Sequence, residues 1–412
     1  MNLTAWAVER DGTSGREVHL LVTVEAAADA PRAPVAVNLV LDRSASMRGA
    51  PLAAAVEAAQ LLVERAGAKD YLGLLAFDGV PEQLAPLAIM DAAARARLIE
   101  RLSAMKTGQG TALHEAVESS AAAMRRLFVP GARPKMLVLT DGEPSVGPRA
   151  LAEFRTLGSQ VAESGISLHA LGLGRHYLPE ILEALTGPSG TGFTHVDDAE
   201  GLPLAAAALV AELFGEVGTY ARLFVRPTGF SELLCRHRYP ARTEGDALGV
   251  GLGSLSHAFA RRALFTGRLE SAEWSLAVTT TWMENGDTRR VTVPVQRVLP
   301  DSAEGRMIRA VGVELDLVAA ESASWKALLR KNAPGAEQAL STAEAALNEL
   351  VALAAEQVPA RRHVERLKDL RQAVERKAGE LPALLVRRAR AEDARTGLSI
   401  VQALPLPRKS GN

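Results

Sequence analysis

The sequence predicts an α/β fold in which a doubly wound, mostly parallel sheet is inserted in a β-sandwich and followed by a C-terminal helical region. Three observations indicate this fold class. In the first half of the chain, short segments that are apolar throughout alternate with helical patterns, as in parallel sheets that are covered on both faces. A stretch of β-type segments follows, and the last part of the chain is helical with dense charges.

Residues 1–32 are predicted to form a β-hairpin that contributes to the sandwich. The segments "LTAWAVE" and "EVHLLVTVEA" roughly alternate apolar and polar residues, and "RDGTSGR" between them contains Asp-Gly and Ser-Gly pairs. Alternation with period two is typical of half-buried strands, and such pairs favour a tight turn. "DAPRAP" is interpreted as a linker to the next segment.

Residues 33–217 are predicted to form the α/β domain. Its apolar strands are expected at 35–41, 70–77, 135–140, 166–173 and 192–196, and a strand with a proline suited to a sheet edge at 82–90. Its helices are expected at 50–66, 91–104, 112–127, 148–164, from 178 and at 199–216.

Three further segments complete the expected organisation. Residues 218–303 are predicted to be all-β and to complete the sandwich with the N-terminal hairpin, and "ENGD" within them favours a two-residue hairpin turn. Residues 304–400 show apolar positions at helical spacing and are predicted to form a helical bundle or arm. Residues 401–412 are interpreted as a tail.

Bulk composition restricts the class of function. A chain of 412 residues allows two or three domains, and 48% hydrophobic with 23% charged residues is ordinary for a globular protein. A formal net charge of −1 and a single cysteine, Cys235, argue against bulk attraction to nucleic acid and against an internal disulfide. Neither a signal peptide nor a transmembrane helix is recognised in the pattern. We therefore expect a cytoplasmic protein that binds neither nucleic acid nor membrane.

Oxygen-bearing side chains occur in three loops of the predicted α/β domain. In "LVLDRSASM", Asp42, Ser44 and Ser46 come directly after the first apolar strand. "KTGQGTALHEAV" places Thr111 at the start of a helix, and "LVLTDGEP" places Asp141 directly after another buried strand. In doubly wound sheets, ligands bind at the carboxyl ends of strands, where neighbouring loops converge. These five side chains are therefore expected to meet at one site.

An oxygen-only set of donors predicts a hard divalent cation. Carboxylates and hydroxyls suit Mg²⁺, with Ca²⁺ or Mn²⁺ as alternatives, rather than zinc. Two carboxylates and three hydroxyls leave the cation able to accept a further carboxylate. Helix capping is the alternative role for the aspartate and serines of the first loop. The arrangement predicts a binding device that needs no nucleophile or base.

The motifs "LVLDRSASM", "GQGTAL" and "LVLTDGEP" resemble, in order and separation, the metal-ion-dependent adhesion site (MIDAS) of von Willebrand factor type A (VWA) domains. The resemblance covers roughly residues 33–200 and implies the Rossmann-like VWA fold. Ala45 departs from the glycine that commonly separates the two serines, but that position is not a ligand. The implied ligand positions are all filled, with hydroxyls that bind directly and carboxylates that bind directly or through water: Ser44, Ser46, Thr111, Asp42 and Asp141.

A weaker resemblance covers more of the chain. A VWA domain set within β-segments and followed by helices is similar to a group of bacterial cytoplasmic proteins, and to the core of inter-alpha-trypsin-inhibitor heavy chains. The resemblance implies that a partner protein supplies an Asp or Glu to the metal, in signalling or assembly, beside an ATPase or a kinase–phosphatase pair. We therefore predict a protein-interaction module that is not an enzyme.

Two alternatives stay open. One is a VWA subunit of an AAA+ ATPase machine, as in magnesium chelatase, with the ATPase motifs on a partner because this chain has none. The other is a metal-dependent hydrolase, since a bound cation can activate water, although the motif segments lack a separate general base. The glycines of "LGVGLGSL" precede no helix, and "GQG" lacks a lysine, so neither is interpreted as a nucleotide loop.

Overall fold

The computed structural model describes residues 1–12, 15–126, 131–174, 176–189, 191–196, 199, 201–237, 239–257, 260–284, 286–353 and 359–375. Within them the chain divides into two compact units. One unit is Arg32–Gly215, and the other combines Met1–Pro31 with the described residues from Glu216 onward. The predicted helical segment beyond residue 375 and the tail at 401–412 lie outside the described residues.

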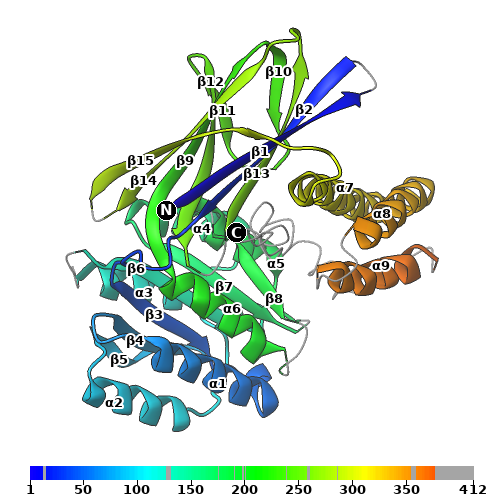
Figure 1. Ribbon diagram of the computed structural model, residues 1–412. Coiled ribbons are helices and arrows are strands. Elements are labelled where there is room, and N and C mark those ends of the chain that lie inside the picture. Colours follow the sequence, from blue (N-terminus) through cyan, green and yellow to red (C-terminus); the bar gives the residue numbers. More distant parts are fainter. Residues whose placement is uncertain are drawn as a thin grey trace. The chain divides into compact units, whose positions relative to one another are not determined.

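The Arg32–Gly215 unit is built on one six-stranded sheet. Its strands are β3 (Val35–Asp42), β4 (Tyr71–Phe77), β5 (Pro81–Ile89), β6 (Arg133–Thr140), β7 (Ser167–Leu173) and β8 (Phe193–Val196). Their order is β5-β4-β3-β6-β7-β8 (Figure 1), and every neighbouring pair is parallel except β4 and β5. The antiparallel edge strand β5 carries the proline that the sequence analysis assigned to an edge, where a missing N–H is tolerated.

Helices cover both faces of this sheet. They are α1 (Ala50–Arg65), α2 (Ala92–Ser103), α3 (Leu113–Arg126), α4 (Leu151–Glu163), α5 (Pro179–Thr186) and α6 (Leu202–Phe214). One hydrophobic cluster packs α1, α2 and α6 on the sheet, and a second packs α3, α4 and α5 on it. Leu39 and Val40, neighbours on β3, belong to different clusters and are both fully buried. Since successive side chains of a strand point to opposite faces, the sheet is covered on both sides.

A buried aspartate fastens the start of β3. The two carboxylate oxygens of Asp70 accept hydrogen bonds from the Arg32 guanidinium at 2.7 and 2.6 Å, and from the backbone N–H groups of Val35 and Gly67 at 3.1 and 2.6 Å. Burial by itself raises the pKa of Asp70, but these hydrogen bonds outweigh burial and bring the pKa below its ordinary value. The strand that leads to the site is thereby held at its amino end.

The second unit contains two five-stranded sheets. One has the order β10 (Phe230–Cys235), β13 (Arg261–Leu269), β2 (Gly15–Glu25), β1 (Asn2–Gly12) and β16 (Gln296–Arg297). The other has the order β11 (Ala241–Glu244), β12 (Ala247–Ser256), β9 (Glu216–Thr228), β14 (Ser275–Glu284) and β15 (Asp287–Pro294). The hairpin strands β1 and β2 pair antiparallel, and β2 continues the sheet by pairing antiparallel with β13.

The two five-stranded sheets share one hydrophobic core. A single cluster of buried side chains includes Leu20 and Phe265 from the first sheet and Leu223 and Val278 from the second. The N-terminal hairpin therefore packs with strands that come after the α/β unit in the sequence.

Three helices follow these strands: α7 (Ala303–Leu329), α8 (Ala333–Leu353) and α9 (Pro359–Glu375). They share a cluster that includes Leu317, Leu340 and Leu370, one residue from each helix. The start of α7 is capped by Ser302, whose hydroxyl accepts the Gly305 N–H at 3.0 Å. None of the helices in the described residues combines the length and apolar content that crossing a bilayer requires.

Two elements differ from the sequence prediction. The strand β11 lies in the segment predicted to be all-β, but its four residues, "ARTE", show no strand pattern of their own, because they are polar and lie exposed or half-exposed at a sheet edge. The helix expected from 148 begins at Leu151, where the Glu153 side chain accepts the Ala150 N–H at 2.8 Å and so satisfies a backbone donor before the helix.

Candidate metal centre

Three loops at one edge of the six-stranded sheet carry the predicted site residues. β3 ends with Asp42, and Ser44 and Ser46 lie at the short 3-10 turn that follows. Asp141 comes directly after β6, and Thr111 lies two residues before α3. Because β3 and β6 are parallel neighbours, their carboxyl ends meet at the same edge, which is where doubly wound sheets bind ligands.

Four of these side chains are linked by hydrogen bonds. Ser44 Oγ and Ser46 Oγ lie 2.9 Å apart, and the Ser46 hydroxyl donates to Asp141 Oδ1 at 2.7 Å. Asp42 Oδ1 accepts the backbone N–H of Ser44 at 2.8 Å, which turns the aspartate and the serines toward one another. Asp42 and Ser44 are almost completely buried, at 0% and 2% exposure.

The fifth residue, Thr111, faces the same point as the others. A Cβ atom added to Gly142 would lie 3.5 Å from Ser46 Oγ, 3.6 Å from Thr111 Oγ1 and 3.9 Å from Asp42 Oδ2. Oxygens from two loops therefore face Gly142 of the third loop, whose Asp141 accepts the Ser46 hydroxyl. The structure brings all five predicted residues together, and their role as metal ligands stays a prediction.

Two residues that position the site were not predicted from the sequence. The hydroxyl of Thr140, the last residue of β6, donates to Asp42 Oδ2 at 2.5 Å. Ser145 Oγ accepts the Thr111 N–H at 2.8 Å, and Thr111 O accepts the N–H groups of Ser145 and Val146 at 3.0 and 3.3 Å. Their hydroxyls within or beside "LVLTDGEP" were the available signal, but nothing in the spacing shows what they bind.

Glycines allow the Thr111 loop to approach its neighbours closely. The Gly108 N–H donates to Arg43 O at 2.8 Å, which joins this loop to the one that follows β3. A Cβ on Gly79 would lie 2.8 Å from Gln109 O, and a Cβ on Gly110, where φ is +79°, would lie 3.1 Å from the Gly79 Cα. The "GQG" segment thus serves close backbone packing beside the site.

An ion-pair network borders the site on the β4 side. Arg43 Nε donates to Asp78 Oδ2 at 3.1 Å, and Arg43 Nη2 lies 2.8 Å from Glu82 Oε2. Asp78 Oδ1 also accepts the Val80 N–H at 3.2 Å, so Asp78 holds the turn between β4 and β5 as well. The Arg43 charge is thereby shared between two carboxylates.

Both carboxylates of the cluster hold protons more tightly than in water. Burial raises the pKa of Asp42 to about 6, against hydrogen bonds from Thr140 and Ser44, and the Asp141 charge adds to the increase. Burial also raises the pKa of Asp141, against the Ser46 hydrogen bond and the electrostatic interaction with His176. In the part of the chain that the structure describes, neither carboxylate forms an ion pair with arginine or lysine. A divalent cation beside them would lower both pKa values.

Other candidate ligands are used elsewhere. His169 is buried within β7, and His195 Nδ1 lies 2.7 Å from the Tyr177 hydroxyl. In the second unit, burial raises the pKa of the Cys235 thiol to about 11, which suits an unreactive side chain. No group of three or more His, Cys, Asp and Glu residues is arranged to hold a metal among the described residues. The hydroxyl-rich cluster with two carboxylates is therefore the candidate metal centre.

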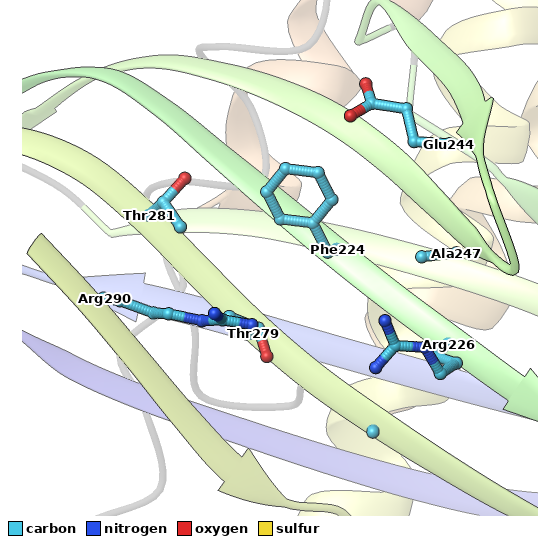
Figure 2. A pocket seen from close by; sticks show the side chains of 8 residues that line it. Phe224, Arg226, Glu244, Ala247, Thr279, Thr281 and Arg290 are labelled. Atoms are coloured by element: carbon cyan, nitrogen blue, oxygen red, sulfur yellow. The ribbon is translucent and has the colours of Figure 1, made fainter. Parts of the chain in front are cut away.

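The second unit carries a hollow of about 350 Å³ on the sheet that contains β9 and β14 (Figure 2). Its one carboxylate, Glu244, is bound by Arg242 at 2.6 Å and by Arg222, and Arg226 pairs with Asp246 at 2.6 Å. These lining residues offer neither a metal-ligand set nor a nucleophile with a base: Phe224, Arg226, Glu244, Ala247, Ala277, Thr279, Thr281 and Arg290.

Comparison with known families finds a match for the α/β unit. Residues 37–206 match the family model described as von Willebrand factor type A domain. Residues 37–206 are therefore similar to a VWA domain. The match spans the strands from β3 to β8 and all five predicted site residues. An uncharacterized protein of Synechocystis sp. is 29% identical to the chain over 192 residues, which are 45% of this chain and 43% of that protein, so less than half of the relative's length is covered.

Two solved structures share the fold. A von Willebrand factor type A structure from Catenulispora acidiphila is 16% identical with a TM-score of 0.62, and the similarity covers 90% of this chain and 89% of that one. The ArnB paralog VWA2 from Sulfolobus acidocaldarius is 18% identical with a TM-score of 0.53, and the similarity covers 96% of this chain and 97% of that one. At these identities the likeness concerns the fold, and it extends beyond the VWA domain. The predicted α/β fold class is confirmed.

Proposed function

We propose that the VWA domain is a metal-dependent protein-binding module. In this proposal the five clustered side chains hold a divalent cation that takes an Asp or Glu side chain of a partner protein as a further ligand. The observation that carries the proposal is the convergence of Ser46 Oγ and Asp42 Oδ2 from one loop and Thr111 Oγ1 from a second on the space beside Gly142 of the third.

The chemistry of the donors supports a hard cation. All five side chains present oxygen, the preference of Mg²⁺, Ca²⁺ or Mn²⁺. Asp42 and Asp141 would balance the charge of one divalent ion, and burial raises the pKa of each in its absence. When bound, the ion supplies a Lewis-acidic position that accepts a carboxylate oxygen.

The surroundings support binding rather than catalysis. The Ser44 and Ser46 hydroxyls bond to each other and Ser46 donates to Asp141, and within the described part of the chain none of the three hydroxyls bonds to a histidine or lysine. A hydroxyl needs an adjacent base to act as a nucleophile at neutral pH. We therefore infer that the module is not an enzyme and that the partner's acidic residue is its ligand.

The experiment is affinity capture from a lysate of the source organism on the immobilised full chain, followed by binding of the captured protein in purified form. We expect capture in Mg²⁺ and release by EDTA. Replacing one acidic residue of the purified partner by its amide should abolish binding, because the cation then loses its outside ligand.

The matched variant is Thr111→Val, which keeps the shape of a nearly buried side chain and removes only its hydroxyl oxygen. It should reduce partner binding at least tenfold, while Thr156→Val on α4, exposed on the surface, should bind as the wild type does. Partner binding that is the same in Mg²⁺, in EDTA and in Thr111→Val would reject the proposal.

A further inference from the structure

Two valines are exposed on the loops that border the candidate metal centre. Val80, between β4 and β5, is 64% exposed, and Val146, in the loop after β6, is 37% exposed. Their backbones are fixed, since Val80 O accepts the Asp78 N–H at 3.3 Å and the Val146 N–H donates to Thr111 O at 3.3 Å. Both side chains are therefore presented to solvent by well-held turns.

The two valines flank a strip of backbone without side chains. A Cβ on Gly110 would lie 3.0 Å from Val146 Cγ2 and 3.1 Å from the Cα of Gly79, the residue that precedes Val80. Gly110 in turn precedes Thr111, whose Cα is about 3.8 Å away along the chain. The valine–glycine–valine strip is thus about one residue from a hydroxyl that faces the candidate cation position. We call Val80, Gly79, Gly110 and Val146 the apolar rim.

The charges next to the apolar rim are mainly acidic. Arg43 is already shared between Asp78 and Glu82, which leaves that network with one excess negative charge. Glu143 is exposed in the loop that leads to Val146, where the Arg149 guanidinium donates to Ser145 O, so these groups together keep an excess of one negative charge. A partner segment with several acidic residues would be repelled here, whereas one with a single carboxylate for the metal and apolar neighbours would not.

We propose that the apolar rim selects the partner: the VWA domain binds a protein segment in which a single Asp or Glu is accompanied, within two residues, by an apolar side chain that packs on Val80 and Val146. The inference rests on the proposed function, because the acidic residue is anchored by the cation. The metal supplies the attachment, and the rim discriminates between acidic segments.

A random peptide library displayed on phage tests this inference without a known partner. The full chain, immobilised in Mg²⁺, is used for selection, and bound phage are eluted with EDTA. We expect the eluted sequences to contain one Asp or Glu with Leu, Ile, Val, Met or Phe within two positions, and to lack runs of acidic residues. The Val80→Ser/Val146→Ser double variant should still select one acidic residue but lose the apolar preference.

A matched control is Ile89→Ser, which removes another exposed apolar side chain, 43% exposed, from the far end of β5. Synthetic peptides from the selection should bind the double valine variant about tenfold more weakly and Ile89→Ser as tightly as the wild type. Metal binding itself, followed by Mn²⁺ titration, should be unchanged in both variants.

The outcomes separate this inference from the function on which it rests. The selected peptides could be acidic and metal-dependent but show no apolar preference, or bind the double valine variant as tightly as the wild type. Either result would reject partner selection by the apolar rim and would still support metal-dependent binding. Absence of any sequence that depends on Mg²⁺ would overturn both.

Discussion

Two fully buried aspartates of the α/β unit have opposite electrostatic roles. Asp70 is bound by Arg32 and by two backbone N–H groups, and its pKa is lowered despite burial. Burial raises the pKa of Asp42 to about 6, and no cationic side chain pairs with it in the described residues. Asp70 therefore stabilises the fold as a carboxylate, whereas the ionised form of Asp42 destabilises the protein unless a cation is added.

Replacing Asp42 by asparagine should stabilise the metal-free protein. The folded state binds the Asp42 proton up to a pH of about 6, so the stability that this proton provides is lost as the pH rises through that value. In EDTA at pH 8, urea unfolding should show Asp42→Asn to be more stable than the wild type by roughly 3 kcal/mol. Near pH 4 the two should be equal. Added Mg²⁺ should stabilise the wild type and leave the variant unchanged.

Asp70→Asn is the control, and its expected change in the free energy of unfolding has the opposite sign. Because the pKa of Asp70 is lowered on folding, its contribution is present above the pKa of the unfolded chain and is lost as the pH falls through the folded value. Breaking its pair with Arg32 should cost roughly 3 kcal/mol at pH 8, with less difference in acid. A destabilised Asp42→Asn protein at pH 8 in EDTA would contradict the electrostatic account of the site.

At the scale of elements, hydrogen bonds between loops hold Thr111 in position beside the other site residues. The Thr111 loop is tied to the loop after β6 through three hydrogen bonds with Ser145 and Val146. Of these, only the one to Ser145 Oγ uses a side chain, so it can be removed without altering the backbone.

Ser145→Ala should therefore loosen Thr111 and weaken Mg²⁺ binding without unfolding the protein. Loss of a residue that orients a metal ligand costs about tenfold or more in affinity. Calorimetric titration with Mg²⁺ measures this change. Ser119→Ala, on the exposed face of α3, should bind Mg²⁺ as the wild type does. Equal affinity of Ser145→Ala and wild type would show that the Thr111 loop does not depend on this bond.

The elements of the α/β unit were predictable for a physical reason. Strands such as β3, buried on both faces, appear as unbroken apolar runs, and helices beside them repeat apolar residues at helical spacing. β11 carries no such pattern, because an edge strand with exposed polar residues buries too little to mark the sequence. The sequence predicted only that the N-terminal hairpin joins the later strands in one sandwich, and not that β2 pairs with β13, since long-range strand order leaves no local pattern.

At the scale of the whole molecule, the sequence predicted the residues of the candidate site but not the residues that position them. Asp42 is the last residue of β3, and Ser44, Ser46 and Asp141 lie in the loops that follow β3 and β6, where topology alone brings loops together. The parts played by Thr140 and Ser145 depend on side-chain hydrogen bonds between segments far apart in sequence. Neither periodicity nor spacing encodes such bonds.

Each hydrophobic cluster takes its residues from one unit only. Because residues 32–215 contain two complete clusters, this segment expressed alone should fold cooperatively and bind Mg²⁺ as the full chain does. Urea unfolding followed by circular dichroism, with and without Mg²⁺, tests this expectation. A non-cooperative transition would show that the flanking strands are needed for the α/β unit to fold.

The central claim is that five oxygens from three loops hold one divalent cation. Titration of the metal-free full chain with Mn²⁺, followed by electron paramagnetic resonance, measures it most directly. The account predicts one bound Mn²⁺ per chain, lost in Asp141→Asn and weakened in Thr111→Val. Binding of Mn²⁺ with unchanged affinity in both variants, or no binding to the wild type, would contradict it.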